Sequence, residues 1–140
     1  MGIDDPRQGE LLEKLVEGVD GALGTVGEID KRLVACSKLL RVGDDADTFT
    51  ALSSCISNLG DLFDLVREIR NGTSVLKTRS VPADAFASWE KSVDLFREML
   101  TAFEGKDWIT LADLIQYEIS PLLAEGEKDL TRVRELLAAA

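Results

Sequence analysis

The sequence predicts an all-α protein, an antiparallel up-and-down four-helix bundle with long first and last helices. Three observations predict this fold. Apolar residues recur at alternating intervals of three and four, no stretch alternates long enough for a strand, and turn signals divide the chain into four segments. The 140 residues are enough for one hydrophobic core. We therefore expect a single domain over residues 1–140, with residues 1–8 as a frayed tail.

The first helix is expected from Gln8 to Arg41, because Gly43-Asp44-Asp45 follows as a turn. Four glycines recur every third residue within this helix, and each costs up to about 1 kcal/mol relative to alanine. Three explanations stay open: a close crossing with the last helix, a flexible joint, or an exposed face that tolerates glycine. The four residues are Gly18, Gly21, Gly24 and Gly27.

The second helix is expected to begin with Asp47 as its cap and to stop at Asn71-Gly72. Its apolar residues fall on one face, with Leu62, Leu65 and Ile69 as additional apolar positions beside it. The residues of the main face are Phe49, Leu52, Ile56, Leu59, Phe63 and Val66.

The third helix is expected from Pro82 to Gly105, with Leu95 and Met99 beside its main apolar face. That face consists of Phe86, Trp89, Val93, Phe96, Leu100 and Phe103. Asp107 is expected to cap the fourth helix, which runs toward the C-terminus. Since proline removes a helical hydrogen bond, we expect this last helix to be kinked at Pro121.

The charge balance indicates which partners the chain can have. It contains 26 acidic and 16 basic residues, a net charge of -10, which disfavours nucleic acid and anionic membranes. The acidity is also consistent with a role in solubility alone. No segment approaches the roughly 20 apolar residues of a membrane span, and the N-terminus does not have a signal peptide's pattern. These features predict a cytoplasmic protein with a protein partner.

The absence of histidine limits the chemistry. A Ser-His or Cys-His nucleophile pair is impossible, and the usual zinc and di-iron sites lack their ligands. The cysteines, Cys36 and Cys55, are expected to be free structural thiols in a reducing compartment, because packed helices usually hold cysteines too far apart for a disulfide. We therefore expect no catalytic residue, no metal and no cofactor.

Two functions remain. The first is a non-enzymatic adaptor or chaperone-like protein that acts through helix–helix contacts with itself or another protein. The alternative is a small-molecule-binding or carboxylate-based enzymatic bundle, with a pocket near Trp108, Tyr117 and Glu118.

The first and last expected helices are longer than the second and third, and this difference suggests how the chain could associate with a second copy. If the first and last helices extend beyond the other two, their ends expose apolar residues that a second copy would cover, giving a homodimer. A basic stretch at the same end would attract the acidic start of the chain, within one chain or between two. The competing outcome is a monomer whose ends fold back or fray. The expected interaction residues are Leu12, Leu15, Val19, Arg67, Arg70, Lys77, Arg79, Leu130, Val133 and Leu137.

Overall fold

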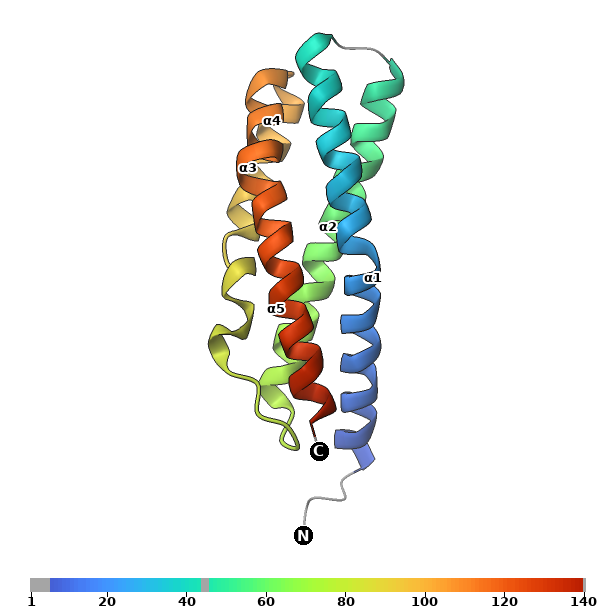
Figure 1. Ribbon diagram of the computed structural model, residues 1–140, viewed down its shortest axis with the longest axis vertical. Helices are drawn as coiled ribbons and strands as arrows, with labels where there is room; N and C mark the ends of the chain where they lie inside the picture. Colours follow the sequence, from blue (N-terminus) through green and yellow to red (C-terminus); the bar gives the residue numbers. More distant parts are fainter. Residues whose placement is uncertain (1–5, 44–45, 140) are drawn as a thin grey trace.

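The computed structural model describes residues 6–43 and 46–139, and this part of the chain is helical without any strand. The predicted all-α class is confirmed. The helices are α1 (Pro6–Val42), α2 (Ala46–Val75), η2 (Ala83–Trp89, a 3₁₀-helix), α3 (Ser92–Glu104), α4 (Trp108–Leu114), η3 (Ile115–Ile119, a π-helical turn) and α5 (Ser120–Ala138). In Figure 1 the chain runs upward through α1, downward through α2, upward through η2 and α3, and downward to the C-terminus.

No helix in the described part of the chain is both long enough and apolar enough to cross a membrane. The core lies along the axis of the molecule and receives residues from every helix. Helix α1 packs extensively on both α2 and α5, whereas α2 packs only sparsely on α3. Part of the surface of α2 is therefore left open beside α3.

Helix α1 begins earlier than expected, since Pro6 occupies its first position, where proline fits best. The frayed tail predicted over residues 1–8 is therefore wrong for residues 6–8, while residues 1–5 lie outside the described part. The Gln8 side chain is in fact fixed: its amide oxygen accepts from the Lys77 backbone N–H at 2.7 Å. The other end of α1 stops at Gly43 as predicted, at a φ of 155° that favours glycine.

Helix α2 continues past its predicted stop at Asn71-Gly72 and ends at Val75. The glycine has a packing role instead, because a methyl group at Gly72 would lie 2.5 Å from Leu15 Cδ2. At the other end, α2 begins at Ala46, so Asp47 belongs to the first turn and is not its cap. Residues 44–45, where the cap would stand, are outside the described residues.

The extension of α2 overturns the predicted exposure of the helix ends. Leu15, Val19, Leu130, Val133 and Leu137 are all buried within the single chain, each 5% exposed or less. Gly72, in the extended part of α2, lies against Leu15 of α1, while α1 and η2 pack on α5. The segment that follows α2 adds the buried side chain of Leu76. Leu12 is only partly covered, but it packs against the same core.

The predicted third helix is interrupted. The 3₁₀-helix η2 ends at Trp89, and α3 starts a new α-helix at Ser92. Because 3.0 and 3.6 residues per turn cannot share one register, the predicted apolar face does not continue across the junction. Phe86 and Trp89 are buried as expected, but Val93 is 52% exposed. The buried side of α3 instead consists of Ser92, Leu95, Met99 and Ala102.

Segment η2 is fastened to α5 by Trp89. Its indole Nε1–H donates to the Gly126 carbonyl at 3.2 Å, and the Ser88 backbone N–H donates to Asp129 Oδ2 at 3.0 Å. Gly126 leaves room for the ring, which a methyl group there would overlap. Gly126 thus permits a close approach between α5 and η2.

The glycines of α1 have different surroundings. A methyl group at Gly18 would meet Ile69 of α2 at 3.3 Å, whereas one at Gly21, Gly24 or Gly27 would meet nothing within 4 Å. Of the three explanations, the structure favours tolerance in open surroundings for these three positions and close packing on α2, not on the last helix, for Gly18.

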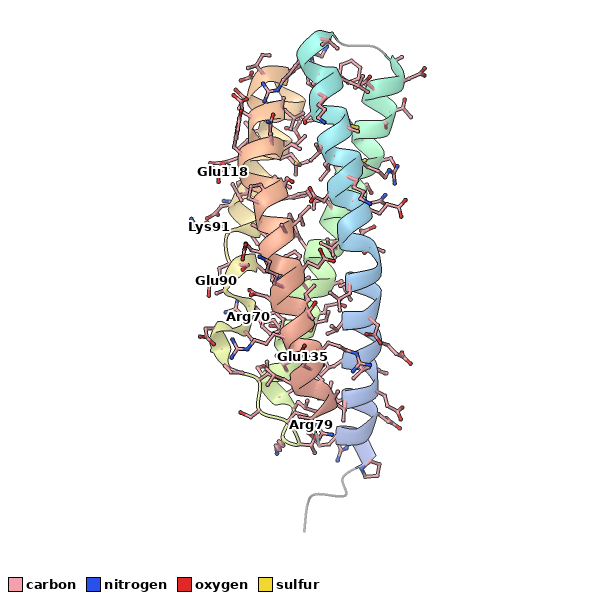
Figure 2. The ribbon with its side chains drawn as sticks, viewed as in Figure 1. Arg70, Arg79, Glu90, Lys91, Glu118 and Glu135 are labelled. Atoms are coloured by element: carbon pink, nitrogen blue, oxygen red, sulfur yellow. The ribbon has the colours of Figure 1, made fainter. Side chains whose placement is uncertain are left out.

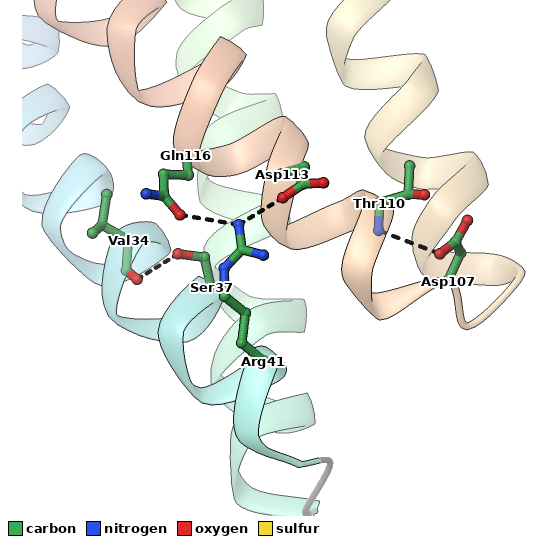
Figure 3. Close-up of polar contacts among 7 residues, drawn as sticks. All are labelled: Val34, Ser37, Arg41, Asp107, Thr110, Asp113 and Gln116. Carbon is green, nitrogen blue, oxygen red and sulfur yellow. Dashed lines mark hydrogen bonds and ion pairs between the residues drawn. The ribbon is translucent and has the colours of Figure 1, made fainter.

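The last helix begins as predicted, since Asp107 caps α4 by accepting from the Thr110 backbone N–H at 3.3 Å (Figure 3). The π-helical turn η3 then precedes Pro121, which occupies the first turn of α5. The kink expected at Pro121 stays a prediction. Polar contacts join α1 to this last helical stretch. Arg41 Nη2 donates to Asp113 Oδ1 at 2.7 Å and to Gln116 Oε1 at 3.0 Å, both drawn in Figure 3, and Arg134 Nε donates to Asp20 Oδ1 at 2.8 Å.

Candidate functional site

The four predicted basic residues have different surroundings, although Arg67 and Arg70 line one depression beside η2. Arg67 pairs with Asp64, one turn away on the same helix. The Arg79 side chain contacts the end of α5, where its Nε donates to the Leu137 carbonyl at 3.0 Å. Arg70 and Lys77 are exposed, and Figure 2 shows Arg70 and Arg79 in the lower half of the molecule. Among the described residues, no ion pair joins Glu10, Glu13 or Glu17 to this basic stretch.

The three residues of the alternative enzyme hypothesis are not brought together. Trp108 lines a groove at the end of the molecule where α4 starts, whereas Tyr117 and Glu118 line a different, shallow depression with Lys91. Tyr117 is 64% exposed, and Glu118 is exposed at the surface of Figure 2. Within the described residues, no group of three or more potential ligands is arranged to hold a metal ion.

Both cysteines are free and buried, Cys36 on α1 and Cys55 on α2. Burial, and next to it the neighbouring Cys55 thiol, raises the pKa of Cys36 from 9.0 to about 11, although Arg32 opposes the shift. A thiol with a raised pKa is a poor nucleophile at neutral pH. This pair therefore fits the structural role expected from the sequence.

A groove lies between α2 and the segment that joins α3 to α4. Its volume is about 830 Å³, it is open to solvent, and its surface is mainly apolar. We call it the aromatic groove. It is lined by Phe49, Thr50, Ser53, Ser54, Ser57, Asn58, Phe103, Glu104, Lys106 and Trp108.

Three rings from three helices form the apolar part of the aromatic groove. The Phe49 and Trp108 ring centroids are 4.6 Å apart at 58°, and those of Phe103 and Trp108 are 6.0 Å apart at 70°. Such tilted and edge-to-face pairs are favourable beyond the area they bury. All three rings remain partly accessible. They therefore offer a fixed apolar surface to a partner at little entropic cost.

The opposite wall is polar. Helix α2 presents hydroxyl and amide side chains there, where an ordinary bundle helix would carry apolar residues toward its neighbour. This explains why α2 packs so sparsely on α3. Helices α2 and α3 approach each other closely at Gly60, where a methyl group would lie 3.0 Å from Phe96 Cζ. The Phe96 ring also packs edge to face with Phe63, with ring centroids 5.8 Å apart.

This groove was not predicted from the sequence, although the sequence holds a trace of it. Helix α2 contains Ser53, Ser54 and Ser57 within five residues, soon after Phe49 of its main apolar face. A continuous third helix would place Phe96, Leu100 and Phe103 at the centre of the core, so no groove was expected beside these serines. The three apolar side chains of α3 are only partly buried.

The comparisons with known proteins give one finding. A family model for a domain of unknown function, DUF8042, matches residues 19–128. The chain belongs to the DUF8042 family. The matched range covers most of the chain and includes every residue of the aromatic groove. Neither the comparison with curated proteins nor that with solved structures found a match.

Proposed function

We propose that this chain is a non-enzymatic, adaptor-like module that binds a helical segment of a partner protein in the aromatic groove. The observation that carries the proposal is the sparse packing between α2 and α3, which leaves a mainly apolar groove of about 830 Å³ open to solvent. Exposed apolar hollows of this kind are characteristic of interaction sites. Placement of an amphipathic helix in a groove is a common form of peptide recognition.

The shape of the groove favours a helix over a small molecule. Small-molecule sites usually bury most of the ligand's surface, which an open groove does not do. The lining residues of α2, Phe49 to Asn58, extend for about 15 Å, or nearly three turns of a helix. We propose that the helices form an up-and-down bundle whose last helix bends at Pro121. A partner helix of about three turns would complete that bundle beside α2.

The alternative function requires Trp108, Tyr117 and Glu118 to share a pocket, and they lie at two separate places. The homodimer was predicted because apolar residues at the helix ends were expected to be exposed. Leu15, Val19 and Val133 are among those residues, and they are buried in the single chain. We propose a different protein as the partner, in a cytoplasmic setting. Sedimentation equilibrium distinguishes this from self-association.

A groove-blocking substitution tests the function. Ser53 is exposed on the polar wall, so Ser53→Arg fills the groove without disturbing the core. Ala124, exposed on α5 and away from the groove, provides the matched control Ala124→Arg. We expect affinity capture from native host cells to recover a partner with the wild type and with Ala124→Arg, but not with Ser53→Arg. Equal recovery by all three proteins contradicts the proposal.

A further inference from the structure

We infer that the aromatic groove selects a basic amphipathic helix, about three turns long, from another protein. This inference rests on the proposed function and adds the chemistry of the partner. It combines three properties of the groove: its apolar rings, its length, and the charges along its edges.

On α2, an aspartate lies beside one end of the groove and another lies beyond the other end. Asp47, Thr50, Ser54 and Asp61 follow one another at intervals of three, four and seven, so they share one face of the helix. Thr50 and Ser54 line the groove, which places Asp47 beside one end of it. Asp61 follows beyond the other end, where it lines the neighbouring hollow between α1 and α2 together with Arg32. Both aspartates are exposed, and no ion pair to either is present within the described residues.

The opposite edge adds Glu104 and Asp107 on either side of Lys106. Beside the groove itself, the carboxylates of Asp47, Glu104 and Asp107 thus outnumber the Lys106 ammonium group, and Asp61 lies one turn beyond Asn58. Cationic side chains on the outer faces of a bound helix would meet these carboxylates, while its apolar face meets Phe49, Phe103 and Trp108. A helix with acidic flanks would be repelled.

A second copy of this chain does not fit that description. Its net charge is -10, so two copies repel each other at long range. Its exposed large apolar residues are also scattered, at Leu39, Val42, Val75, Val93, Ile109 and Tyr117, instead of forming one face of one helix. The acidic edges therefore indicate a basic partner of a different sequence.

The test uses three designed 14-residue peptides without tryptophan, with blocked ends. The first has leucines on one helical face and lysines on the other, the second replaces the lysines with glutamates, and the third is a scramble of the first. Trp108 reports binding through its fluorescence, because it lies in the groove whereas Trp89 is buried. Isothermal calorimetry measures affinity independently, and Trp108→Phe identifies the source of the optical signal.

We expect the basic amphipathic peptide to bind with a blue shift of Trp108 emission, at least about tenfold more tightly than either other peptide. The triple variant Asp47→Asn, Asp61→Asn, Glu104→Gln should weaken this binding about five- to tenfold and reduce its salt dependence. Asp107 is left intact because it caps α4. Ser53→Arg should abolish binding, and Ala124→Arg should not.

Three results would overturn the inference: equal affinity for the acidic peptide, equal affinity for the scrambled peptide, or no binding of the basic peptide. Equal affinity for the acidic peptide would show that the groove binds helices regardless of their charge. Equal affinity for the scrambled peptide would show that charge attracts the peptide without any fit of an apolar helical face into the groove. If the basic peptide does not bind but Ser53→Arg still abolishes capture from host cells, the proposed function survives and only the partner's chemistry is wrong. If capture is also insensitive to Ser53→Arg, both fail.

Discussion

Trp89 shows how one residue decides the path of a segment. Its ring is buried against Gly126 of α5, and its indole N–H satisfies the Gly126 carbonyl. Aromatic side chains contribute much of a core's buried area, and a buried indole N–H needs an acceptor. The glycine on α5 and the tryptophan on η2 therefore form a matched pair.

This pair gives the first prediction. Gly126→Ala should destabilise the protein by about 2–4 kcal/mol, because the new methyl group overlaps the Trp89 ring and displaces it from the core. Gly24→Ala should instead stabilise it by about 0.5–1 kcal/mol, since a methyl group there meets nothing within 4 Å and alanine favours the helix. Urea denaturation measures both values. Similar effects at the two glycines would contradict the packing at Gly126.

Cys36 gives a prediction for alkaline pH. Its pKa is raised from 9.0 to about 11 by burial and by the Cys55 thiol, so the folded state holds the proton more tightly than the unfolded state does. The stabilisation is fully present below pH 9 and is lost as the pH rises toward 11. At about 1.4 kcal/mol per pKa unit, roughly 2–3 kcal/mol should be lost across this range.

The measurement is the free energy of unfolding against pH for the wild type and for Cys36→Ala. Other groups titrate in both proteins, so the difference between the two curves isolates Cys36. We expect the wild type to lose its advantage between pH 9 and 11. A constant difference across that range would show that the thiol's pKa is not raised.

At the scale of elements, the end of α5 depends on a side chain from the segment after α2. The last carbonyls of a helix have no helical partner, and Arg79 donates to one of them, the Leu137 carbonyl. Arg79→Ala should speed amide hydrogen exchange in the last turn of α5 about fivefold, as expected for the loss of roughly 1 kcal/mol. Arg132→Ala, which removes an exposed charge from α5 itself, is the control. Equal exchange in the two variants would show that Arg79 does not hold this turn.

The existence of the helices was predictable from apolar spacing, but their ends and registers were not. Gly72 resembles a stop signal, yet its role is to admit Leu15, a contact between residues far apart in sequence. The break between η2 and α3 depends on Trp89 and Gly126, which are likewise distant. Spacing along one segment carries no information about such contacts, so the predicted third helix was continuous and the predicted helix ends were exposed.

At the scale of the whole molecule, the groove follows from an imbalance in packing. Helix α1 packs extensively on both α2 and α5, whereas α2 packs sparsely on α3 and carries hydroxyl groups along the open groove. The net charge follows from composition alone. The position of carboxylates near the partly exposed rings of Phe49, Phe103 and Trp108 depends instead on how the helices pack. The site therefore lay beyond the sequence analysis, although the serines of α2 were visible in it.

The central claim is that this groove is the surface on which a partner helix lies, and site-specific photo-crosslinking in native host cells tests it most directly. A photo-reactive amino acid at Ser57, on the groove's polar wall, is compared with the same residue at Ala124 on α5. The account predicts a discrete adduct with a partner protein from position 57 and none from position 124, with the crosslinked peptide coming from a helical, lysine- or arginine-rich segment. Adducts in equal yield from both positions, or none from position 57, would contradict it.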